Sequence, residues 1–147
     1  MEREDKNSGK DSLKQKLSEL KLESQDDLST LNHILEVIKT ATSPKDFLVP
    51  LLCLLENNPT FYFGMPGEVV RTIEKHYQEN DYFDLVIQSV ERVPTEYNLW
   101  LLNRLMNTFD DEEKVKKGLA VFHRVKQETG CNKIREIAQE FIENFDE

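Results

Sequence analysis

Apolar residues recur at intervals of three and four along most of this chain, and this spacing restricts the fold more than any other feature. In the segment GEVVRTIEKHY (67–77), steps of about 100° per residue place the apolar side chains within an arc of about 100°. Residues 82–90 and 132–145 repeat the pattern. The alternation of apolar and polar residues that is typical of strands is absent from the sequence. The sequence therefore predicts an all-α fold.

Prolines, glycines and capping residues divide this pattern into separate helices. After a weak first helix that begins near Asp11 or Ser12, we expect seven helices of about 9–18 residues. The expected boundaries are a start at Ser43 and Pro44, with Pro50 kinking that helix or marking its true start, a cap at Asp110, a stop at Gly130 and a cap at Asn132. We expect the polar segment 1–10 to be a disordered tail.

Short polar turns join the predicted helices, so successive helices are expected to pack antiparallel. Pairing them gives units of roughly 35–40 residues at 28–57, 66–92 and 95–128, followed by a closing helix. This period favours stacked helix hairpins of the HEAT or armadillo kind, and an irregular helical bundle is the alternative.

Length and composition limit the class of protein. The chain has 147 residues, enough for one domain, and we expect residues 11–147 to form a single helical domain. Its net charge of −9 argues against nucleic acid or an anionic membrane as the main partner and permits a basic protein. The sequence contains no apolar stretch typical of a signal peptide or a membrane span, so we expect a cytoplasmic protein.

The residue pattern predicts no catalytic, metal or cofactor site. Each of the three histidines, His33, His76 and His123, lacks a second metal ligand three or four residues away. The two cysteines, Cys53 and Cys131, have no metal or redox spacing. No serine follows the strained Gly-x-Ser-x-Gly pattern of a hydrolase nucleophile. We therefore expect a protein that is not an enzyme.

The segment PTEYNLWLLNRLMNT (94–108) combines polar and apolar residues in an unusual way. Trp100, Asn103, Arg104 and Asn107 lie at i, i+3, i+4 and i+7, so they share one side of a helix that is otherwise largely apolar. In one interpretation, Arg104 pairs with Glu74 of another helix and the asparagine amides satisfy loop backbone. In the other, the polar stripe contacts a partner, since Trp and Arg often dominate interface energetics.

Negative charge is concentrated in residues 80–113, which hold eight acids and two bases, whereas residues 114–147 hold seven bases and six acids. A solvated set of helix faces and a partner-binding acidic surface are both compatible with this pattern. For the second interpretation, the predicted partner-binding residues are Asp81, Tyr82, Asp84, Glu96, Trp100, Asn103, Asp110 and Asp111.

The string FGMPGEVVRTIEKHY followed by PTEYNLWLLNRLMN resembles the core of a helical immunity-protein family from bacterial polymorphic-toxin and contact-dependent growth inhibition systems. The likeness covers roughly a third of the chain, and this chain has Glu68 and Asn98 where family members often have Pro and Thr. The resemblance implies that the shared motif builds the scaffold, and we assign structural roles to Gly64, Pro66, Gly67, Glu74, Pro94, Arg104 and Asn107.

The resemblance also implies a function. Such a protein binds one cognate toxin domain and neutralises it without chemistry, as a monomer that forms a heterodimer with the toxin. A basic toxin cleft, as in a nuclease, is the partner that the acidic surface would fit. The alternative is a helical-repeat adaptor that binds some other protein.

Overall fold

The computed structural model describes residues 13–24, 26–40, 47–59, 61, 63, 67–76, 80–108 and 111–145. Within these ranges the regular structure is entirely helical, which confirms the all-α prediction. No helix in these ranges is long and apolar enough to cross a membrane. The predicted tail at 1–10 and the predicted helix start at Ser43 and Pro44 lie outside the described residues.

The chain divides into two compact units, Met1–Gln78 and Glu79–Glu147. Each unit has its own helices and its own buried apolar residues. The single domain expected for residues 11–147 stays a prediction.

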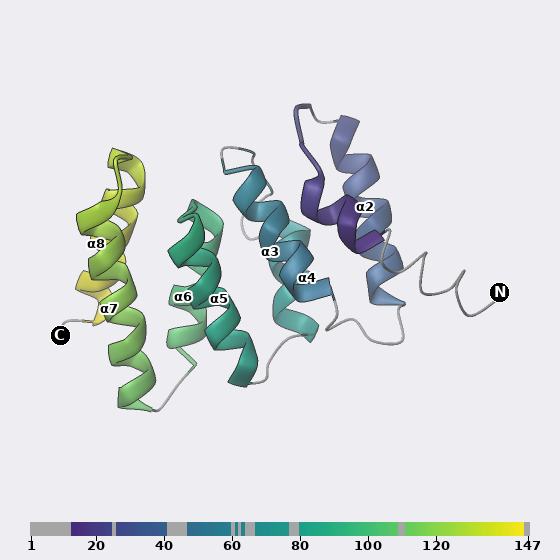
Figure 1. Cartoon of the computed structure of the whole chain (residues 1–147). Helices are drawn as coiled ribbons and strands as arrows, with labels where there is room; N and C mark the ends of the chain where they lie inside the picture. Colours follow the sequence, from purple (N-terminus) through teal and green to yellow (C-terminus); the bar gives the residue numbers. More distant parts are fainter. Residues whose placement is uncertain are drawn as a thin grey trace. The chain divides into compact units, whose positions relative to one another are not determined.

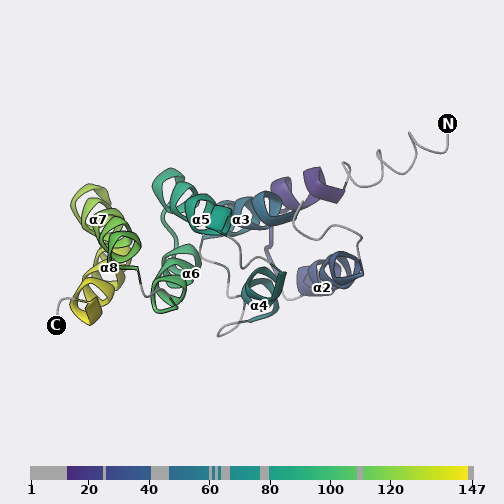
Figure 2. The ribbon, with the colours of Figure 1, turned by 90° about the horizontal axis from the view of Figure 1, so that it is seen from below.

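Unit 1 contains a short helix at 13–19, followed by α2 (Asp26–Lys39), α3 (Leu48–Asn57) and α4 (Gly67–His76). Helix α4 contacts both α2 and α3 (Figure 2). The predicted apolar stripe of α4 is confirmed by Val69, Val70 and Ile73, which are all buried. Apolar burial at helical spacing therefore forms the core of this unit.

Pro50 was predicted either to kink its helix or to mark the true start of that helix. The second prediction is correct, because Pro50 lies at the start of α3. The helix begins at Leu48, so Pro50 occupies its first turn. Backbone N–H groups in that turn have no carbonyl partner within the helix, and the missing N–H of proline therefore costs no hydrogen bond.

The start of α2 is fixed by an acidic side chain. The backbone N–H groups of Glu23 and Ser24 donate to Oδ2 of Asp27 at 2.8 and 3.1 Å. These two hydrogen bonds, chiefly the one from Glu23, lower the pKa of the Asp27 carboxyl from its ordinary value. At the other end of α2, the hydrogen bond and charge of Glu36 raise the pKa of Lys39.

Two asparagines at the end of α3 form hydrogen bonds to segment 13–24, which lies before α2 in the chain. Asn58 is buried, its Oδ1 accepts from the backbone N–H of Leu22 at 2.7 Å, and its Nδ2 donates to the carbonyl of Leu20 at 2.8 Å. Asn57 donates from its side chain to the carbonyl of Ser18. These bonds satisfy backbone groups that no regular element pairs.

Unit 2 consists of two helix hairpins. Its helices are α5 (Asn80–Arg92), α6 (Glu96–Met106), α7 (Glu112–Glu128) and α8 (Asn132–Phe145) (Figure 1). Helix α5 packs on α6, and α7 packs most extensively on α8. Helix α6 also contacts α7, as the predicted pair at 95–128 requires, although α6 packs more extensively on α5 and α7 on α8. The predicted pair at 66–92 joins α4 of unit 1 to α5 of unit 2 and stays a prediction.

One predicted boundary in unit 2 is confirmed and two need correction. The predicted stop at Gly130 is confirmed, since α7 ends at Glu128 and Gly130 directly follows its C-cap Thr129, although the φ of Gly130 lies outside the left-handed region. The cap of α7 is Asp111, whose Oδ1 accepts from the backbone N–H of Glu113 at 2.9 Å, and Asp110 lies outside the described residues. The predicted cap Asn132 is instead the first residue of α8, and its Oδ1 accepts from the guanidinium of Arg135 at 2.7 Å.

The core of unit 2 is built from the apolar stripes of all four helices. Phe122 of α7 is fully buried, and its ring centroid lies 5.6 Å from that of Phe141 of α8. Gly118 of α7 faces Met106 of α6 so closely that a Cβ on Gly118 would lie 2.8 Å from Met106 Cε. Glycine is therefore needed at this position for close approach of the two helices.

Candidate functional site

Helix α6, which carries the predicted polar stripe, contacts the other three helices of unit 2. This confirms within unit 2 that the helix is covered on several sides. The stripe itself divides into exposed and buried members. Trp100 is half-buried, and the guanidinium of Arg104 lies 5.6 Å from the centroid of its ring, so that this exposed cation is held by the indole. Asn107 is exposed and is the C-cap residue of α6.

Asn103 behaves differently from its neighbours in the stripe. It is buried, with an exposed fraction of 9%, and its Oδ1 has no hydrogen-bond partner within the described part of the chain. The prediction that asparagine amides of this stripe satisfy loop backbone is therefore wrong for this oxygen. A buried acceptor without a donor is destabilising by about 1–3 kcal/mol.

The polar residue that organises α6 is Asn98, which the sequence analysis noted only as a departure from the family pattern. Its Oδ1 accepts from the backbone N–H of Thr95 at 2.7 Å, and the Thr95 hydroxyl accepts from the backbone N–H of Asn98 at 3.1 Å. The Asn98 Nδ2 donates to Ser89 Oγ at 3.1 Å and to the carbonyl of Val93 at 2.8 Å. One side chain thus caps α6 and ties it to the end of α5.

A sequence signal for this arrangement existed. Thr95 and Asn98 have the spacing of a capping box, in which Glu or Gln usually occupies the last position. The amide of Asn98 performs the same reciprocal bond while also donating twice, which a carboxylate could not do. The role of Asn98 in the first turn of α6 was missed because asparagine is unusual at the last position of a capping box.

The structure divides the predicted acidic residues into different environments. Asp84 of α5 pairs with Lys117 of α7 at 2.9 Å, and Glu96 of α6 pairs with Lys133 of α8 at 3.1 Å. Tyr82 is buried, with only 4% of its surface exposed, so its ring belongs to the core of the unit. The side chain of Asp81 and the whole of Asp110 lie outside the described residues.

The start of α7 holds three acids in a row, the N-cap Asp111 and the first-turn residues Glu112 and Glu113. Asp111, Glu112 and Glu113 are all exposed, and among the described residues no ion pair involves any of them. We call these three residues the acidic turn. Their position at a helix N-terminus stabilises α7 through the helix dipole, by about 0.3–1 kcal/mol each. Negative charge from the predicted acidic surface is therefore available to a partner here, whereas Asp84 and Glu96 are already paired.

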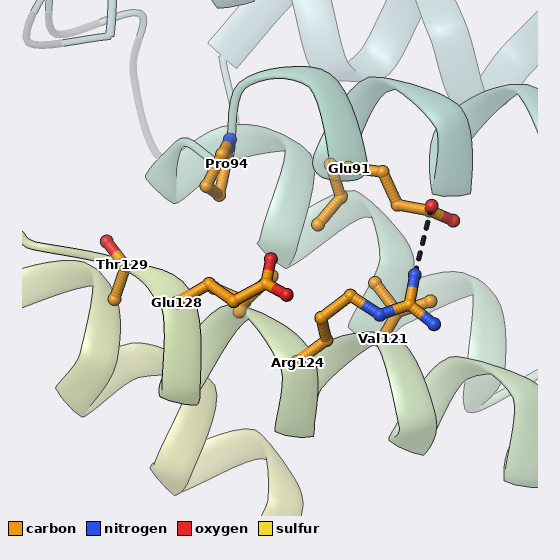
Figure 3. A pocket seen from close by; sticks show the side chains of 8 residues that line it. Glu91, Pro94, Val121, Arg124, Glu128 and Thr129 are labelled. Atoms are coloured by element: carbon orange, nitrogen blue, oxygen red, sulfur yellow. Dashed lines mark hydrogen bonds and ion pairs between the residues drawn. The ribbon is translucent and has the colours of Figure 1, made fainter.

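A groove of about 420 Å³ runs between the α5–α6 connection and α7 (Figure 3). Its lining combines apolar and charged residues. The lining residues are Val90, Glu91, Pro94, Val121, Arg124, Val125, Glu128 and Thr129. Glu91 and Arg124 form an ion pair across the groove at 3.1 Å, drawn as a dashed line in Figure 3. The walls of this groove come from segments about 30 residues apart in the chain, so the sequence pattern does not predict it.

The residues assigned to the scaffold fall in both units. Gly64 and Pro66 lie outside the described residues, and Gly67 is the first residue of α4. Pro94 lines the groove. Glu74 is half-buried in α4 of unit 1, whereas Arg104 belongs to unit 2, and their ion pair stays a prediction.

The described residues contain no group of three or more His, Cys, Asp or Glu side chains that could hold a metal ion. Comparison of the chain with protein-family models, with curated proteins and with solved structures finds no match.

Proposed function

We propose that this chain is an immunity-type protein that binds a basic toxin domain and neutralises it by covering its substrate cleft. The observation that carries this proposal is the acidic turn, which presents three adjacent carboxylates that no described base neutralises. It lies in a unit whose residues 79–147 include fifteen acids and nine bases. A toxin that cleaves nucleic acid needs a cationic cleft, and an acidic surface competes for that cleft with the substrate.

Three inter-helix ion pairs among the described residues of unit 2 also support a binding role for the scaffold. They join α5 or α6 to α7 or α8 at Asp84–Lys117, Glu91–Arg124 and Glu96–Lys133. Their members are between 37% and 71% exposed, so each pair contributes only about 0–1 kcal/mol to stability. A partner that offers bases can exchange with these weak pairs at little cost.

The proposal includes a fold of stacked HEAT-like helix hairpins. It also includes a location in the cytoplasm, where the protein would bind a toxin that enters the cell. Two hairpins in unit 2, α5–α6 and α7–α8, support the first feature. A helical-repeat adaptor for another basic protein is the second candidate, and the same charge surplus favours it.

The test uses the full chain and the C-terminal domain encoded by the neighbouring gene. The double variant Glu112→Lys with Glu113→Lys reverses two charges of the acidic turn. Its matched control is Glu136→Lys with Glu140→Lys, which makes the same change at two exposed positions of α8. We expect the first variant to slow association by about tenfold or more at low salt and the control to change it little.

Stability must be measured beside affinity, because the acidic turn also interacts with the dipole of α7. A loss of melting temperature without a loss of association rate would assign these acids to helix stability alone. If no complex forms, or if association of the folded variants is unchanged and insensitive to salt, the proposal is wrong.

A further inference from the structure

The two ion pairs between α5 and α7 share one offset along the chain. Asp84 pairs with Lys117 at 2.9 Å and Glu91 pairs with Arg124 at 3.1 Å, and the members of each pair are 33 residues apart. The acids lie about two turns apart on α5, and the bases lie about two turns apart on α7 in the same order. The two helices therefore run parallel, and both ion pairs report one register of α7 against α5.

Two further acids extend this pattern toward both ends of α7. Glu113 lies four residues before Lys117, and Glu128 lies four residues after Arg124. Steps of about 100° per residue place all four side chains within an arc of about 60°, on the side of α7 that faces α5. Both glutamates are exposed, and neither makes an ion pair with a described residue. This face of α7 therefore carries, in chain order, an acid, two bases and an acid.

The helix dipole explains only one of these two outer acids. An acid in the first turn, such as Glu113, interacts favourably with the N-terminus of α7. Glu128 is the last residue of the same helix, where the dipole makes a negative charge unfavourable. The position of Glu128, which Figure 3 shows beside Arg124, therefore has a different physical reason.

A slide of α7 along α5 by one helical turn supplies that reason. A slide of four residues in one direction brings Glu113 to the place of the paired base opposite Asp84. A slide in the other direction brings Glu128 to the place of the paired base opposite Glu91. Each slide therefore breaks both ion pairs and places two carboxylates opposite each other, where like charges repel.

Apolar packing beside α5 distinguishes these registers less sharply than the charges do. Val121 and Val125 lie about one turn apart on α7 and are both buried, so a one-turn slide places one valine where the other was. Gly118 opposes the slide at a different contact, because its close approach to Met106 of α6 leaves no room for a larger side chain. The charges act between α7 and α5, where the apolar residues repeat.

We propose that this charge pattern is a conformational device that holds the α7–α8 hairpin in one register against α5. The two ion pairs stabilise the observed register, and the two outer acids disfavour the registers one turn away. Each exposed contact is weak, but a slide changes three contacts at once, so the population of a slid register falls by about tenfold. The device needs no partner and is therefore independent of the proposed function.

A swap of two charges tests the device in the full chain without changing the net charge. The double variant Glu113→Lys with Lys117→Glu moves the favourable contact with Asp84 one turn along α7. Its matched control, Glu112→Lys with Lys116→Glu, makes the same swap at exposed positions outside the arc that faces α5. Both swaps affect the helix dipole alike, so we expect a lower urea midpoint of unfolding for the first variant than for the control. Equal midpoints would contradict the proposal.

Cross-linking measures the register itself, in a background in which both native cysteines are replaced by serine. The pair Gln88→Cys with Ala120→Cys reports the observed register, since both positions are exposed and lie between the two ion pairs. The pair Gln88→Cys with Lys116→Cys reports the register one turn away. After the charge swap, a short bismaleimide reagent should link the second pair about three- to tenfold faster, relative to the alkylation rate of each thiol.

A single neutral change keeps the test decisive if the charge swap unfolds the chain. Glu113→Gln removes one like-charge contact of a slid register and leaves both ion pairs intact, so it should speed linking of the second pair by about two- to threefold. Glu140→Gln, the same change on the exposed surface of α8, should not. If Glu113→Gln leaves linking of the second pair no faster than Glu140→Gln does, packing alone sets the register and the proposal is wrong.

Discussion

Asn98 offers the sharpest test of how unit 2 is held together. Its side chain is fully buried and makes three hydrogen bonds, to the backbone N–H of Thr95, to Ser89 Oγ and to the carbonyl of Val93. Asn98→Ala removes all three and leaves a buried backbone N–H without its acceptor. A hydrogen bond contributes a net of about 0.5–1.5 kcal/mol, so we expect a loss of about 2–4 kcal/mol in the free energy of unfolding.

The assay follows the fluorescence of Trp100 during urea denaturation of the full chain. This is the single tryptophan of the sequence, and it lies in α6, so its transition reports on unit 2. The matched control is Asn107→Ala, at an exposed position of the same helix, which should change stability by less than about 0.5 kcal/mol.

An isosteric variant separates shape from hydrogen bonding. Asn98→Asp keeps the acceptor for Thr95 but replaces the Nδ2 donor with an oxygen that faces Ser89 Oγ and the carbonyl of Val93. We expect it to be at least as destabilising as Asn98→Ala, because a buried carboxylate oxygen then faces the carbonyl oxygen of Val93 with no proton between them. If Asn98→Ala costs less than about 1 kcal/mol, or no more than Asn107→Ala, the proposed role of this side chain is refuted.

Two further predictions concern packing and pH. Gly118→Ala should destabilise unit 2 by about 1 kcal/mol, because overpacking against Met106 outweighs the better helix propensity of alanine, and the same change in a Met106→Ala background should be neutral or stabilising. A stabilising effect in the native background, measured by Trp100 fluorescence, would show that the close approach is not restrictive. In unit 1, the pKa of Asp27 is lowered in the folded state, so its contribution to stability is present above the unfolded value of about 3.9 and is lost as pH falls through the folded pKa. Asp27→Asn should therefore flatten the acid side of the stability profile, followed by circular dichroism, and an unchanged slope would contradict the assignment.

The sequence by itself determined the elements of this protein. Repeats of apolar residues at three and four positions, such as those around Val70 and Ile73, identified the helices because a helix that lies on a core buries one apolar face. Pro50 limited α3 to two possibilities, a kink or a start near this residue, because the conformational restriction of proline acts on neighbouring backbone alone. The charge surplus of residues 80–113 needed only counting.

Only the tertiary structure decided how these elements and charges are used. Asp84 and Lys117 are 33 residues apart in the chain, so their pairing depends on how α5 packs against α7, which periodicity does not specify. The same packing pairs Glu96 with Lys133, leaves the acidic turn of α7 without an ion pair to any described residue, and forms the groove beside Glu128. Local spacing fixes which face of a helix is apolar, but the partner of a polar side chain is set by the neighbouring helix.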